Sequence, residues 1–220
     1  MLLTVITFDH AKTVIAIILS LSITHLIKGM VNFIEHPKSL KAYWVHLLWC
    51  GYLLLLIIHF WWWEAALKDV SHWNFAKYFF LFIYISTYYV LCVLLMPSNL
   101  GEHKSYVDYF YSRKKWFFGI LGLCFLLDFI DTFLKGSDYF FIHYGWEYPI
   151  RNVTHIALCI AAIYSNNRTF HALLVLLFVL YESSYIYRLF WCSILEELCS
   201  VYLNRRVITA LFENLNWRDL

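Results

Sequence analysis

Six long runs of apolar residues, separated by short polar segments, dominate the pattern of this chain. A helix needs about 20 mostly apolar residues to cross a bilayer, and runs near this length occur at residues 13–34, 43–63, 75–96, 116–134, 149–164 and 170–191. Proline cannot continue a helix but fits its first turn, in agreement with Pro97 after the third run and Pro149 at the start of the fifth. The pattern predicts an all-α fold, a six-helix transmembrane bundle over residues 1–191.

Two segments outside the runs are predicted to be helical without crossing the membrane. Residues 102–115 mix charged and aromatic side chains and predict a surface helix that leads into the fourth run. Residues 192–220 carry an apolar stripe interrupted by charges. Such a stripe predicts a C-terminal amphipathic helix, which lies either on the membrane surface or against a partner, a second copy of the chain or another protein.

A few matched positions raise the hypothesis of an internal repeat. The first and fourth runs end in Lys-Gly, and the second and fifth contain a histidine followed four residues later by a cysteine: Lys28-Gly29, Lys135-Gly136, His46, Cys50, His155 and Cys159. Two copies of a three-helix unit would have opposite orientations in the membrane, as in many transporters. The alternative is chance similarity between apolar segments.

Composition agrees with a lipid environment. The chain is 62% hydrophobic and 21% aromatic, whereas soluble domains have about 45–50% apolar residues. Its formal net charge is +2, without a basic block that could follow phosphates, so a cytosolic enzyme and a nucleic-acid binder are both excluded. Most of the six cysteines fall inside apolar runs, which favours buried free thiols over disulfides.

The fourth run contains the strongest anomaly. Asp128, Asp131 and Lys135 are spaced three and four residues apart, so a helix places them along one stripe. A carboxylate at lipid depth costs several kcal/mol (roughly 3 or more) unless it is paired or faces water. One interpretation is a proton or cation site on the inner face of the bundle, with Lys135 as a supporting charge. The other is a polar clamp that fixes helix packing.

Further polar residues lie in the last two runs. Arg151 and His155 share a stripe in the fifth, and we expect Asp131–Arg151 or Asp128–His155 pairs between neighbouring helices. Glu182 falls near the middle of the sixth run, where an acid is a candidate functional residue, with Arg188 nearby as a supporting charge. The predicted ion or proton path therefore consists of Asp128, Asp131, His155 and Glu182.

Other chemistry is less favoured. Transmembrane histidines suit a b-type haem, so His46 and His155 together form an alternative haem or metal site. The sequence lacks the H-E-x-x-H, G-x-S-x-G, P-loop and G-x-G-x-x-G motifs. A protein without catalytic residues or a bound cofactor is therefore the preferred prediction.

Several short motifs together resemble a family of small bacterial multi-pass membrane proteins. They are Trp44-Val45-His46-Leu47-Leu48-Trp49, Phe60-Trp61-Trp62, Met96-Pro97, Asp108-Tyr109-Phe110 and the segment 128–136. The resemblance covers roughly residues 15–190. It implies a location in the bacterial inner membrane and implies no particular activity.

Three functions remain open at this point. The preferred one is a channel- or transporter-like protein that moves a proton or small cation past buried carboxylates. The second is a sensor or effector subunit that transports nothing and docks a partner through its tail. The third is an electron carrier with a single b-type haem.

Overall fold

The computed structural model describes residues 8–35, 43–70, 73–97, 103, 105–135 and 146–191. The chain divides into two compact units, Met1–Val179 and Leu180–Leu220, and each is described by itself. The predicted amphipathic helix at 192–220 lies outside the described residues.

Six α-helices make up most of the described chain, and the described ranges contain no strand. Their bounds are α1 Phe8–Glu35, α2 Trp44–Trp63, α3 Phe75–Leu95, α4 Tyr106–Lys135, α6 Glu147–Tyr164 and α7 Arg168–Ile186. A 3-10 turn, η1 Glu64–Asp69, continues α2, and a π-helical turn, η2 Tyr187–Trp191, continues α7. The all-α prediction is confirmed, whereas the inverted repeat stays a prediction.

Five of these helices are long and apolar enough to cross a membrane: α1, α2 with the turn that follows it, α3, α4, and α7 with its π turn. The chain is therefore an integral membrane protein in contact with lipid. The sixth predicted span, α6, is a helix of 18 residues but is not among the five. Its first two turns carry Glu147, Arg151 and Asn152, which lower its hydropathy.

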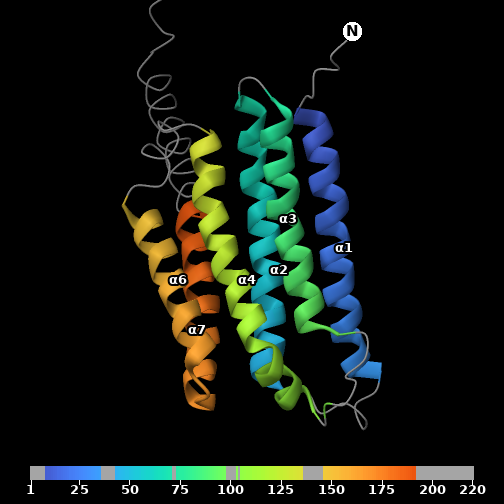
Figure 1. Cartoon of the computed structure of the whole chain (residues 1–220), viewed down its shortest axis with the longest axis vertical. Helices are drawn as coiled ribbons and strands as arrows, with labels where there is room; N and C mark the ends of the chain where they lie inside the picture. Colours follow the sequence, from blue (N-terminus) through green and yellow to red (C-terminus); the bar gives the residue numbers. More distant parts are fainter. Residues whose placement is uncertain are drawn as a thin grey trace, which may run out of the picture. The chain divides into compact units, whose positions relative to one another are not determined.

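In the first unit, α3 packs against α1, α2 and α4, and α4 packs against α6 on another face (Figure 1). The segment before the fourth span is helical and leads into that span, as predicted, and it forms the first part of α4, one helix of 30 residues. The buried residues Tyr106, Tyr109, Phe110 and Phe117 continue at helical spacing through the predicted boundary. They extend the packed face of α4 without interruption.

Both ends of α3 are held by side chains. Its first residues follow Asn74, whose side-chain oxygen accepts a hydrogen bond from the backbone N–H of Lys77 at 2.9 Å, a common N-terminal cap. At the other end, His25 Nε2 of α1 donates to the Met96 carbonyl at 2.6 Å. Next to this contact Gly29 leaves room for Met96, since an added Cβ would lie 2.5 Å from its Cγ.

The turn between α6 and α7 is anchored by α4. The Ser165 carbonyl at the end of α6 accepts hydrogen bonds from Lys114 Nζ and from His171 Nε2, the latter at 3.0 Å. Lys114 is only 4% exposed. A cation at the C-terminal end of a helix also interacts favourably with the helix dipole. Lys114 therefore fixes the end of α6 to α4.

An aromatic cluster around Trp49 forms the centre of the first unit. The Trp49 ring is fully buried and makes edge-on contacts with four other rings at centroid distances of 5.3–5.6 Å: Tyr52, Phe117, Phe118 and Phe178. These rings come from α2, α4 and α7. Edge-to-face pairs are worth about 0.5–1.5 kcal/mol each beyond their burial, so Trp49 joins three helices.

The cysteine prediction is confirmed for four of the six residues. Cys50, Cys92, Cys124 and Cys159 are buried free thiols. They therefore act as small apolar residues in the packed interior.

We expect Trp49→Ala to lower the free energy of unfolding by about 3–5 kcal/mol, because a large buried ring is lost and a cavity remains. Thermal unfolding of the purified protein in detergent measures the loss. Trp116→Ala is the matched control, since Trp116 is 65% exposed on the same α4 that Trp49 contacts. Equal losses for the two variants would contradict the central role of Trp49.

Candidate functional site

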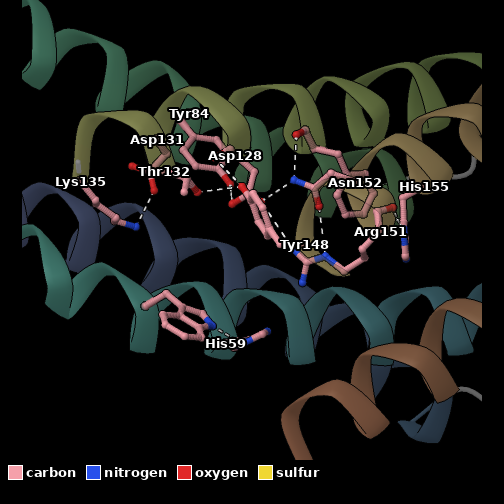
Figure 2. Close-up of polar contacts among 12 residues, drawn as sticks. His59, Tyr84, Asp128, Asp131, Thr132, Lys135, Tyr148, Arg151, Asn152 and His155 are labelled. Atoms are coloured by element: carbon pink, nitrogen blue, oxygen red, sulfur yellow. Dashed lines mark hydrogen bonds and ion pairs between the residues drawn. The ribbon is translucent and has the colours of Figure 1, made fainter. Parts of the chain in front are cut away.

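The acidic residues predicted on the fourth span lie on one side of α4, toward neighbouring helices (Figure 2). Asp131 and Lys135 meet η1, and Asp128 meets α3 and α6. The stripe deduced from the sequence is therefore a layer of polar contacts inside the first unit.

A buried cluster of three charges forms the first part of this layer. Lys135 Nζ lies 2.5 Å from Asp131 Oδ2 and 2.8 Å from Glu64 Oε1. The side chains of Lys135, Asp131 and Glu64 are only 3%, 2% and 4% exposed. Removing such charges from water costs several kcal/mol per ion (roughly 3 or more), and close pairing offsets that cost. The ammonium group therefore holds two carboxylates from different elements.

The two carboxylates of this cluster contact the same ammonium group. Their second oxygens, Glu64 Oε2 and Asp131 Oδ1, find no hydrogen-bond donor among the described residues. Two carboxylates and one ammonium carry a net charge of −1 when all are ionised. A single proton on either carboxylate would neutralise the cluster.

Asp128 is held differently, by several donors. Its carboxylate accepts hydrogen bonds from Tyr148 Oη at 2.7 Å, Asn152 Nδ2 at 2.8 Å, Tyr84 Oη at 3.2 Å and Arg151 Nη2 at 3.4 Å. The Asp128 side chain is 24% exposed, so it is less desolvated than Asp131. Neither of the two expected pairs, Asp131–Arg151 and Asp128–His155, is formed. Arg151 pairs with Asp128 instead.

The tyrosines extend this network in two directions. Because Tyr148 donates its proton to Asp128, its oxygen accepts from Thr132 Oγ1 at 2.7 Å. In the same way Tyr84 donates to Asp128 and accepts from Tyr88 at 3.3 Å. Asp128 is thus the acceptor for the hydroxyl groups of both Tyr84 and Tyr148 (Figure 2).

His155 lies beside this network in aromatic surroundings. Its Nδ1 hydrogen-bonds to the Arg151 carbonyl at 2.7 Å, and its ring centroid lies 4.8 Å from Phe125 and 4.4 Å from Phe178. The backbone carbonyl only accepts, so Nδ1 carries the proton. His155 is therefore oriented by its own helix, one turn away from Asp128's partner Arg151.

The remaining predicted path residues belong to the second unit. Glu182 lies within the last turns of α7. Arg188 lies in the following π turn, where its guanidinium is 5.8 Å from the centre of the Tyr185 ring. The path through Asp128, Asp131 and Glu182 stays a prediction.

The two histidines considered for haem contact different levels of α4. His46 lies next to Tyr106 and Phe110, whereas His155 lies next to Phe125. Fifteen residues along a helix correspond to about 22 Å, so the two rings lie at separate levels. Within the described ranges, no three histidine, cysteine or acidic side chains come together as a metal site. Haem binding stays a prediction.

Four participants of the polar layer were missed by sequence reasoning: Glu64, Tyr84, Tyr148 and Asn152. Glu64 directly follows the tryptophans that end the second span, so it falls outside the predicted run. The two tyrosines do not stand out in a chain with 17. Asn152 could have been identified, because it is a polar residue next to Arg151 on a predicted helix.

In comparisons with protein-family models, curated proteins and solved structures, nothing matches this chain. The bacterial resemblance noted for its motifs therefore gains no support from them, and the polar layer has to be interpreted from its own chemistry.

We expect Lys135→Met to lower the free energy of unfolding by about 3–5 kcal/mol, because it leaves two buried carboxylates without their cation. The triple variant E64M/D131L/K135M removes all three charges and should regain most of the loss. Thermal unfolding in detergent compares the two. A loss below about 1 kcal/mol for Lys135→Met, typical of an exposed pair, would contradict a desolvated cluster.

Proposed function

We propose that this protein is channel- or transporter-like and moves a proton, or less favourably a small cation, across the membrane past its buried carboxylates. The observation that carries the proposal is the pair Glu64 and Asp131 on one ammonium, Lys135. Ionisable side chains at membrane depth commonly mark ion paths and proton relays.

The charge count of the cluster supports proton exchange. With both carboxylates ionised the cluster is negative, and with one proton added it is neutral. In a low-dielectric interior the neutral state is favoured, yet the second acid stays ionised beside Lys135. The site can therefore alternate between two states that differ by one proton.

The position of the lysine argues for a proton over a metal cation. Lys135 Nζ already occupies the place between the two carboxylates that a small cation would take. A metal ion would have to displace this ammonium, whereas a proton can bind the second oxygen of Glu64 or of Asp131 without moving it.

The other polar residues have supporting roles in this proposal. Asp128 and His155 continue the path, with Arg151 balancing the charge of Asp128. Glu182 on α7 is the proposed third carboxylate, and Arg188 is its proposed supporting charge. The proposed location is the bacterial inner membrane, on the motif resemblance alone.

A second candidate function is favoured by the environment of Asp128. Four donors satisfy its carboxylate, as expected for a clamp that fixes α3, α4 and α6 together. In that case the protein is a sensor or effector subunit that transports nothing, and residues 192–220 dock a second copy or another protein.

Proton flux into vesicles tests the first proposal. We expect the full chain, reconstituted in liposomes with an internal pH-sensitive dye, to dissipate a pH gradient. Glu64→Gln keeps the shape of the side chain and leaves a neutral Asp131–Lys135 pair, so the variant should fold. Because it lacks a proton-transfer group, its flux should be lower by roughly tenfold or more. Asp131→Asn should act in the same direction.

Glu35→Gln is the matched control, because Glu35 is an exposed acid at the end of α1 and its loss should leave the flux unchanged. A folded Glu64→Gln protein with the full flux would exclude the proposed proton site. No flux from the unsubstituted protein would favour the non-transporting alternative.

A further inference from the structure

A pocket opens between the beginning of α1 and the end of α2. It has a volume of about 500 Å³. Phe8, Lys12 and Ile15 of α1 form one wall, and Trp61, Trp62 and the η1 turn form the other. The residues that line this pocket are different from those that hydrogen-bond to Asp128.

The residues around this pocket are those expected at the edge of a bilayer. Trp61 and Trp62 are 39% and 64% exposed, and tryptophans of this kind gather at membrane–water interfaces. The Phe8 ring lies 6.5 Å from that of Trp73, just before α3 begins. Starts and ends of three helices therefore meet at the same level, as expected at a membrane surface.

The chemistry of the pocket combines two cations with apolar walls. Lys12 and Lys68 are exposed and line it from opposite elements. The third charged residue in the lining, Glu64, is only 3% exposed and is paired with Lys135, so its carboxylate adds little to the exposed charge of the pocket. The exposed charge of the pocket is therefore positive. Its apolar lining includes Ile15 and the aromatic rings.

We propose that this pocket binds an anionic phospholipid, with the phosphate between Lys12 and Lys68 and the start of an acyl chain against Ile15 and Trp61. The positive charge of the two lysines favours an anionic headgroup. The apolar wall favours a lipid with an acyl chain over a free phosphate compound. A basic residue near an anionic membrane surface is worth about fivefold in affinity, so each lysine should contribute about that factor.

Binding of short-chain lipids to the full-length protein in uncharged detergent tests this assignment by native mass spectrometry. Dioctanoyl-phosphatidylglycerol should bind saturably and at least about tenfold more tightly than dioctanoyl-phosphatidylcholine, as two lysines at about fivefold each predict. Glycerol 3-phosphate, which lacks acyl chains, should not bind at the same concentrations.

Three variants localise the site. Lys12→Gln and Lys68→Gln should each weaken phosphatidylglycerol binding about fivefold, and the matched control Lys115→Gln, an exposed lysine of α4 outside the pocket lining, should leave it unchanged. Ala65→Trp fills the pocket without changing charge and should abolish binding.

Four results would overturn the proposal: equal affinity for the two lipids, binding of glycerol 3-phosphate as tight as that of the lipid, equal weakening by Lys115→Gln, or full binding by Ala65→Trp. All of these measurements report lipid binding and none reports proton flux, so they stand apart from the test of the transport proposal.

Discussion

The interaction on which the polar interior depends is the ammonium group of Lys135 between two carboxylates. Lys135 and Asp131 belong to α4, while Glu64 belongs to the turn that continues α2. Apolar side chains gain little by leaving lipid for a protein interior of equal polarity, so this polar contact adds specificity to the apolar packing of α2 on α4. Lys135 thus ties the turn after α2 to the end of α4.

A second constraint is the saturation of Asp128 by hydrogen-bond donors from α3 and α6. Together with the Lys135 cluster, it places two unlike acids three residues apart on one helix. Asp128 is fixed by neutral and charged donors, whereas Asp131 shares its cation with another carboxylate. Neighbouring acids of the same residue type therefore lie in different charge environments.

Much of this arrangement could be predicted from the sequence, because lipid imposes a simple length rule. The helices, the stripe of Asp128, Asp131 and Lys135, and the involvement of Arg151 all follow from helical spacing and from the cost of burying charge. The partners could not be predicted, since Glu64 approaches Lys135 only through tertiary contact across 71 positions. The burial of the first turns of α4 could not be predicted either, because charged residues such as Lys114 are typical of a surface.

The short helix α6 has a consequence for how the protein reaches its final form. It lacks the apolar length of the other helices, and it carries Arg151 and Asn152 on the side that meets α4. A segment with these groups partitions poorly into hydrocarbon alone. The placement of α6 therefore depends on α4, where Asp128 supplies the counter-charge of Arg151 and Lys114 contacts the Ser165 carbonyl at the other end of α6.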